Sequence, residues 1–348
     1  MIRLSLLQFR VQAVVGVVVL AAFAILLAAT GPHLASLYAA SGIDGCRGGG
    51  CQNLADSFIF EVTVAGYEPL YLASVAIILL APAIIGIFWG APLIARELET
   101  GTSALAWNQS VTRTRWLAAK LTIGALIAMT VTEGLCLVQS WWAAPIGRAA
   151  GYGAASGPLT QGRFSPQVFA THGITPLGYA AFTFALGVAA GALIRRTIPA
   201  MAVTLAIFAA VQVAMPLWIR PHLAPTHHTT ISMASLGYLA GQGSPGGTFA
   251  YVATGLPGRP GTWIISSGAV NAAGRPVSTI PAACVVASVE GGYSGLPDCL
   301  ASQGIREAVS YQPASRYWPF QWIETAIYLA LALALTGYCF RWLNRRLS

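Results

Sequence analysis

Residues 70–102 read LYLASVAIILLAPAIIGIFWGAPLIARELETGT, an apolar run that ends in a short charged segment. The part from 70 to 92 contains no charged residue. A transmembrane helix needs about 20 consecutive apolar residues, so this part is long enough to cross a bilayer. The segment that follows carries Arg96, Glu97 and Glu99. The stretch therefore predicts a membrane-spanning helix with a charged loop at one face of the membrane.

Five further apolar runs share this character. Together with the quoted stretch they predict spans near 11–29, 70–92, 119–143, 176–194, 198–218 and 319–340. Hydrophobic residues make up 56% of the chain and charged ones 9%, against about 25% charged in soluble domains. The first run is longer than the core of a signal peptide, about 7–15 residues, so we expect it to remain a span. Because helices satisfy their own backbone groups in lipid, we predict an all-α, multi-pass protein of the cell membrane with six transmembrane helices.

The basic residues indicate the orientation. With the N-terminus inside, the short cytoplasmic segments hold 11 of the 19 basic residues and two acids, Glu97 and Glu99. The longer outside loops, 30–69, 144–175 and 219–318, hold the other basic residues and most of the acids. The positive-inside rule therefore predicts that both termini are cytoplasmic. The basic residues form no contiguous groove with stacking aromatics, so we expect no nucleic-acid partner.

This topology divides the chain into three parts. Residues 1–218 hold spans 1–5 and a cytoplasmic loop at 93–120. Residues 219–318 are rich in Gly, Pro and Ser and contain strand-like runs at 262–265 and 284–287, so we expect a small, loop-rich extracellular domain. Residues 319–348 form span 6 and a cytoplasmic tail.

Four of the six cysteines fall in the outside loops, where disulfides persist. Four cysteines permit three pairings, and proximity in the sequence favours Cys46–Cys51 and Cys284–Cys299. A metal site is the rival interpretation, but neither pair has the short CxxC spacing of a zinc knuckle. The histidines at 222, 227 and 228 fit a solvated loop better than a metal or proton site, so we expect no metal.

Two acids lie inside the predicted spans, Glu133 well inside the third and Glu324 near the outer end of the sixth. Such residues are costly in lipid and usually face a cavity or a partner. One interpretation is that both line a translocation path. The alternative is that each fixes helix packing through a hydrogen-bonded or protonated carboxyl, or, for Glu324, reaches interfacial water.

Glycines four residues apart stand in two spans, Gly86 with Gly90 and Gly187 with Gly191. Small residues at this spacing let helices approach closely. The pattern leaves open whether they pack within the chain or between two copies, and the first is the simpler expectation.

The loop at 93–120 resembles the signature that ABC-2-type transporter permeases carry between their second and third spans. The matching residues are Arg96, Glu97, Glu99, Gly101, Thr102, Leu105, Ser110, Val111, Thr112, Arg113 and Lys120. Residues 107–117 and the stretch from Tyr311 into Gln321-Trp322-Ile323-Glu324 look like the branch from GC-rich Gram-positive bacteria. Ser110 and Ala119 depart from the family pattern, which often has Pro and Gly there.

The resemblance implies the membrane subunit of an ATP-driven exporter. It implies that the loop docks on a separate nucleotide-binding ATPase subunit, with the coupling residues Arg96, Glu97, Leu98, Glu99, Gly101, Thr102 and Arg113. It also implies a second copy of the chain or a paralogous permease, and a drug, antibiotic, lipid or peptide as cargo, including multidrug resistance as a role.

The chain has no P-loop of its own. Its only lysine, Lys120, is preceded by alanine rather than by the glycine that the motif requires. We therefore expect no enzymatic activity in this chain and place ATP and Mg²⁺ on the partner subunit. The alternatives are a proton-coupled secondary transporter that uses Glu133 and Glu324, and a membrane-embedded enzyme or assembly factor.

Overall fold

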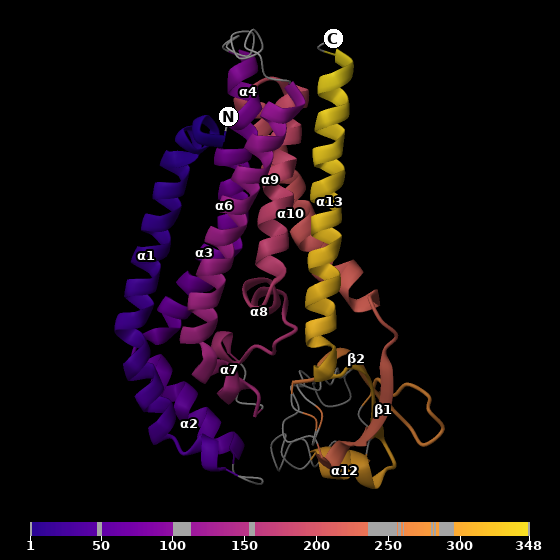
Figure 1. Cartoon of the computed structure of the whole chain (residues 1–348). Helices are drawn as coiled ribbons and strands as arrows, with labels where there is room; N and C mark the ends of the chain where they lie inside the picture. The colour runs from indigo at the N-terminus through magenta and orange to yellow at the C-terminus, as the bar shows by residue number, and fades with distance from the viewer. Residues whose placement is uncertain are drawn as a thin grey trace.

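The computed structural model describes residues 2–46, 51–99, 113–152, 157–235, 261–279 and 296–346, with residues 256, 259, 281, 283 and 284. Long helices form a bundle, and a small domain with a β-sheet lies at one end of it (Figure 1). Both termini lie at the opposite end (Figure 1). We call the end with the termini the inner end and the other the outer end, following the distribution of basic residues.

The elements used below have the following bounds. The helices are α1 (Ile2–Ala40), α2 (Cys51–Val64), α3 (Tyr67–Ile85), η2 (Gly86–Gly90), α4 (Ala91–Glu99), α6 (Arg113–Trp142), α7 (Ala144–Ala150), α8 (Pro166–Thr171), α9 (Thr175–Ile194), α10 (Thr197–Ala214), η4 (Met215–Ile219), η5 (Arg220–His222), α12 (Leu296–Ser302) and α13 (Tyr317–Arg346). The strands are β1 (His227–Ser232), β2 (Trp263–Val270) and β3 (Arg306–Gln312).

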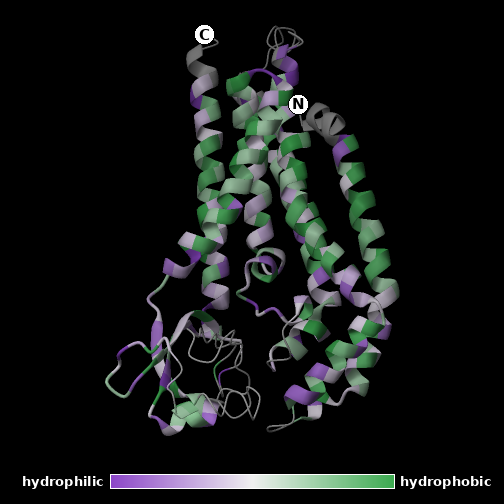
Figure 2. Cartoon of the chain, turned by 180° about the vertical axis from the view of Figure 1, so that it is seen from behind, coloured by the Kyte–Doolittle hydropathy of each residue, from purple (hydrophilic) through white to green (hydrophobic). Residues whose placement is uncertain are grey.

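The described part of the chain contains six segments long and apolar enough to cross a membrane. They are Arg10–Ala40, Tyr67–Glu97, Leu117–Trp142, Thr175–Ile194, Thr197–His222 and Ala314–Trp342. Each coincides with a predicted span, so the prediction of six transmembrane helices is confirmed. Figure 2 shows hydrophobic residues along these helices and more hydrophilic ones at the two ends.

Helical structure extends further into the outer segments than the sequence analysis expects. The helix α1 continues through Pro32 to Ala40, although the apolar run that predicts the first span ends near residue 29. The helix α2 follows in the first outer segment, and it buries Cys51, Ala55, Phe58 and Val62. These positions recur at helical spacing, so α2 has one apolar face that packs on the outer half of the bundle.

The helix α9 lies at the centre of the bundle and contacts α3, η2, α4, α6, α10 and α13. Its sequence is rich in alanine and glycine, which lets neighbouring backbones approach from several sides. A Cβ atom added at Gly86 would lie 2.7 Å from the carbonyl oxygen of Thr183, and one at Gly90 would lie 2.6 Å from that of Phe184. Gly187 and Gly191 meet the backbone of η2 and α4 in the same way. The two glycine pairs therefore pack against each other within the chain.

The outer domain contains a three-stranded antiparallel sheet in the order β1-β3-β2. The strand β2 begins at Trp263 and so includes residues 263–265 of the predicted run at 262–265. Cys284 of the other run lies in a helical turn, and residues 285–287 fall outside the described part. Buried side chains such as Leu300, Val309 and Tyr311 form a small core on this sheet. This domain thus has a core of its own beside the membrane helices.

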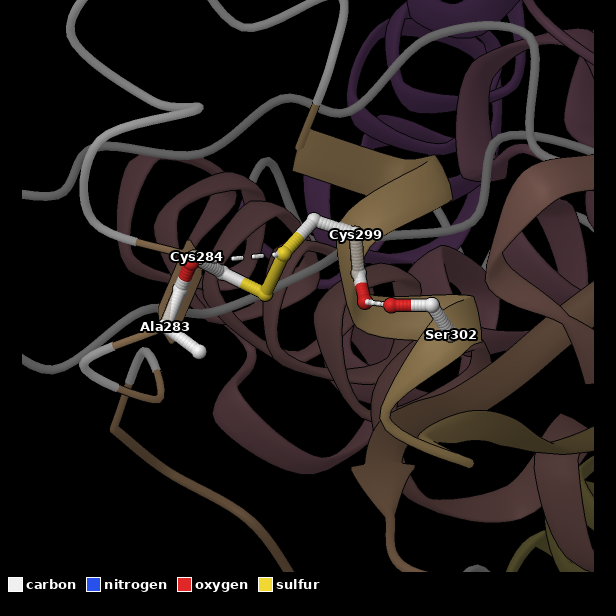
Figure 3. Close-up of a disulfide and its surroundings, with 4 residues drawn as sticks. All are labelled: Ala283, Cys284, Cys299 and Ser302. Atoms are coloured by element: carbon white, nitrogen blue, oxygen red, sulfur yellow. Dashed lines mark hydrogen bonds between the residues drawn. A yellow bond between two sulfur atoms is a disulfide. The ribbon is translucent and has the colours of Figure 1, made fainter.

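Both expected disulfides are present. The pairs are Cys46–Cys51, with 5.6 Å between Cα atoms, and Cys284–Cys299, with 5.7 Å. Figure 3 shows the second bond, where Cys299 lies on α12 and the Ser302 hydroxyl donates to the Cys299 carbonyl oxygen at 2.7 Å. The bond therefore joins α12 to the preceding segment of the outer domain.

Candidate functional site

The predicted coupling residues begin on α4, at the inner end of the second span. The chain passes from α3 through the single π-helical turn η2 into α4, which carries Arg96, Glu97 and Glu99. Leu98 also belongs to α4 and Arg113 begins α6, but the positions of their side chains are not described. Gly101 and Thr102 lie in 100–112, outside the described residues.

Glu97 forms an ion pair across the ends of the coupling loop. The Lys120 Nζ atom on α6 donates to Glu97 Oε1 at 2.5 Å. The Lys120 side chain is 2% exposed and that of Glu97 is 25% exposed. A lysine so deeply buried needs an anionic partner, because removing a charge from water without one is costly. The pair therefore joins α4 to α6 at the inner end of the bundle.

Glu99 joins α4 to a third helix. Its carboxylate accepts hydrogen bonds from the backbone N–H of Thr197, at 2.9 Å, and from the Thr197 hydroxyl, at 2.6 Å. Thr197 is the first residue of α10, so the carboxylate satisfies a free N–H at the positive end of that helix. These hydrogen bonds lower the pKa of Glu99 below its usual range. Glu97 and Glu99, which the resemblance predicts to contact the ATPase subunit, thus already make contacts within the chain.

A second polar cluster lies near the outer end and joins α9, η5 and α13. Arg220 Nε and Nη2 donate to the two oxygens of Glu324 at 2.9 and 3.0 Å, and the Tyr179 hydroxyl donates to Glu324 Oε1 at 2.5 Å. Arg220 is 1% exposed and Glu324 is fully buried. The guanidinium also lies 3.8 Å from the centre of the Phe169 ring. The expectation that Glu324 reaches interfacial water is therefore wrong.

One turn earlier on α13, Gln321 organises the loop before α9. Its Oε1 atom accepts hydrogen bonds from the backbone N–H groups of Ile174 and Thr175, each at 3.0 Å. Its Nε2 atom donates to the carbonyl oxygens of Phe169 and His172, at 3.1 and 3.0 Å. Gln321 thereby caps the start of α9 and holds α8 beside it. Gln321 and Glu324 belong to the stretch that resembles the branch from GC-rich Gram-positive bacteria. Gln321 thus binds the start of α9, and Glu324 binds Tyr179 further along the same helix.

Glu133 is separate from this cluster. It is a half-buried residue of α6, one turn before Cys136. Within the described part of the chain its Oε2 atom has no hydrogen-bond partner, and it shares no hydrogen bond or ion pair with Glu324. The two candidate path residues therefore make no direct polar contact with each other in the described part of the chain.

Arg220 is not among the site residues predicted from the sequence, because a basic residue just after a span is usually interpreted as an interfacial charge. One sequence signal could have predicted the pair: an acid near the outer end of span 6 together with an arginine at the outer end of span 5. In the described part of the chain, no three histidine, cysteine or acidic side chains gather closely enough to hold a metal ion.

A known protein family matches this chain over more than half of its length. A family model described as "ABC-2 membrane transporter related" matches residues 17–220. No curated protein and no solved structure matched the chain. The match begins within span 1, includes spans 2–4 and the helices α4 and α6 with their contacts at the inner end, and ends at Arg220 near the end of span 5. Because it covers more than half of the sequence, the chain belongs to the ABC-2 membrane transporter related family.

Proposed function

We propose that this protein is the membrane subunit of an ATP-driven exporter and that its ATPase subunit docks on α4 and on the segment that joins α4 to α6. ATP and Mg²⁺ would bind to that partner. Family membership supports a transport subunit, and the observation that carries the finer proposal is the position of α4. It prolongs the second span at the inner end, where it contacts α9 and α10.

The contacts of α4 provide a route for mechanical transmission. Glu97 links it to Lys120 on α6, and Glu99 links it to Thr197 on α10. Its backbone also meets α9 at Gly191 without an intervening side chain. A force on α4 would therefore move α6, α9 and α10 together, because it is joined to them by an ion pair, a close backbone contact and a hydrogen bond, respectively.

The same route extends to the outer end through α9. Tyr179 on α9 donates to Glu324 on α13, and Glu324 pairs with Arg220 in η5, which follows α10 and η4 in the fifth span. A tilt of α9 would thus reach both helices that lead into the outer domain. In this proposal the Arg220–Glu324 pair closes the outer half of the bundle, and its separation accompanies opening to the outside.

Charge variants test docking apart from folding. Arg96 is an exposed basic residue of α4, so Arg96→Glu should reduce co-purification of the proposed ATPase subunit. Arg148→Glu at the outer end, 54% exposed, is the matched control and should leave it unchanged. Rim charges set partner choice and association rate, so the effect should weaken as salt rises.

Glu97 pairs with Lys120 within the chain and, in this proposal, takes part in coupling to the ATPase. A charge swap separates these two roles. Glu97→Lys alone places two cations together and should lower the amount of inserted protein, whereas Glu97→Lys with Lys120→Glu restores the internal pair. We expect the swapped protein to insert normally but to couple poorly to the ATPase. Wild-type ATPase binding and stimulation in both the swap and the Arg96→Glu variant would refute docking on α4.

Six spans are half of a twelve-helix exporter, so we propose that two copies, or this chain and a paralogue, work together. Mass measurement of the detergent-solubilised complex tests this, and a transport-active unit with one copy would contradict it. Proton-coupled transport by Glu133 and Glu324 is the weaker candidate, because Glu324 is paired with Arg220 and, among the described residues, shares no hydrogen bond or ion pair with Glu133.

A further inference from the structure

A pocket of about 280 Å³ lies beside the outer polar cluster, between α3, α8, α9 and the end of α10. Its wall is mostly apolar, with a few polar side chains. The residues that matter for the argument are Leu79, Ala170, Phe208, Gln167, Gln212 and Arg220. Apolar pockets with a small number of converging polar groups are typical of ligand sites.

Arg220 is the polar residue that gives this pocket a chemical preference. Its Nε and Nη2 atoms bind Glu324, but in the described part of the chain Nη1 has no hydrogen-bond acceptor although it is buried. A buried donor without an acceptor costs free energy that an added acceptor recovers. The pocket therefore favours a ligand that brings an oxygen to Arg220.

The charge of the ligand follows from the pair. Glu324 already balances Arg220, and the Tyr179 hydroxyl adds a further hydrogen bond to Glu324. An anionic ligand would leave an excess negative charge in a region of low dielectric constant, which is costly. An uncharged oxygen adds a hydrogen bond without that penalty.

We propose that this pocket binds an apolar molecule that carries an uncharged acceptor oxygen, such as a ketone or ester carbonyl, with Arg220 Nη1 as the donor. The proposal names a class of cargo, and as cargo it rests on the proposed transport function. Binding itself requires no ATPase, so it is tested on the protein alone.

Benzophenone is a suitable probe because it combines two phenyl rings with a ketone and forms covalent adducts under near-ultraviolet light. We would irradiate it with the full-length protein in lipid nanodiscs and map the adducts by mass spectrometry. We expect adducts on α8 and on the 208–216 segment of α10 and η4. Ala170→Met fills the pocket and should abolish them, whereas the same substitution at Ala210, exposed on α10, should not.

Competition between matched compounds tests the oxygen. Phenyl benzoate should displace benzophenone at a concentration at least roughly tenfold lower than diphenylmethane, which lacks an acceptor. It should also compete better than 4-benzylbenzoate, the carboxylate analogue. The double variant Arg220→Met with Glu324→Leu, which leaves no unpaired charge, should erase the preference for the ester over diphenylmethane.

Each other outcome overturns a stated part. Adducts elsewhere, or adducts that survive Ala170→Met, would refute the site. Equal competition by diphenylmethane would refute the role of Arg220 Nη1, and the strongest competition by the carboxylate would refute an uncharged ligand. If the ATPase fails to dock while labelling follows the expected pattern, the proposed exporter function fails and the binding site stands.

Discussion

Replacing Gly187 by alanine tests the central packing of α9. A Cβ atom at this position would meet the backbone carbonyl oxygen of Gly86 and lie 2.7 Å from the backbone nitrogen of Ala91. Both atoms belong to helical backbone, so neither can rotate aside as a flexible side chain would. The substitution therefore forces α9 away from η2 and α4.

The magnitude follows from two opposing effects. Overpacking a tight core typically costs about 1–3 kcal/mol, and a clash with backbone belongs at the upper end of that range. Alanine regains up to about 1 kcal/mol of helix propensity over glycine. We expect a net loss of about 2 kcal/mol in the free energy of unfolding.

Gly337 on α13 provides a matched control, because a Cβ atom there meets nothing within 4 Å. Gly337→Ala should leave the free energy of unfolding unchanged or raise it by up to about 1 kcal/mol. The two variants should thus differ by about 2–3 kcal/mol.

The assay is reversible unfolding in mixed micelles with increasing SDS, followed by tryptophan fluorescence. Gly187→Ala should unfold at a clearly lower SDS fraction than Gly337→Ala. Equal midpoints for the two variants would refute the close backbone contact between α9 and α4, and with it the route of transmission proposed above.

Three further predictions concern the polar contacts and the disulfides. Glu324→Gln should destabilise the folded protein by about 3–5 kcal/mol because Arg220 loses its charged partner, and the double variant Glu324→Leu with Arg220→Met should recover most of that loss in the same SDS assay. Glu99 has a lowered pKa, so its contribution to stability is present above its ordinary value of 4.5 and is lost as the pH falls through the lower folded-state value. The difference in thermal midpoint between wild type and Glu99→Gln should therefore vanish in strong acid, and a constant difference from pH 7 to pH 2 would contradict this. The Cys284–Cys299 bond should resist external thiol reagents until reductant is added and should contribute about 3 kcal/mol to the outer domain; free labelling without reductant would show that the bond does not form.

The sequence alone determined the membrane class and the six spans, because hydropathy is a property of consecutive residues. It also led to both disulfides, since cysteines 5 and 15 positions apart meet readily in a flexible loop. The likeness of the 93–120 loop to ABC-2 permeases gave the family that the wider match to residues 17–220 establishes. Each of these inferences depends on local composition or on short separations along the chain.

Side-chain partners were decided only by the tertiary structure. Glu324 and Arg220 are 104 positions apart, and Glu99 and Thr197 are 98 apart. Hydropathy places such residues at a membrane depth but does not say which helix faces which. For the same reason the sequence suggests that Glu97 and Glu99 contact a partner protein, although in the structure they form hydrogen bonds with Lys120 and Thr197. The central position of α9 likewise depends on how several helices pack at once, which no single segment of sequence specifies.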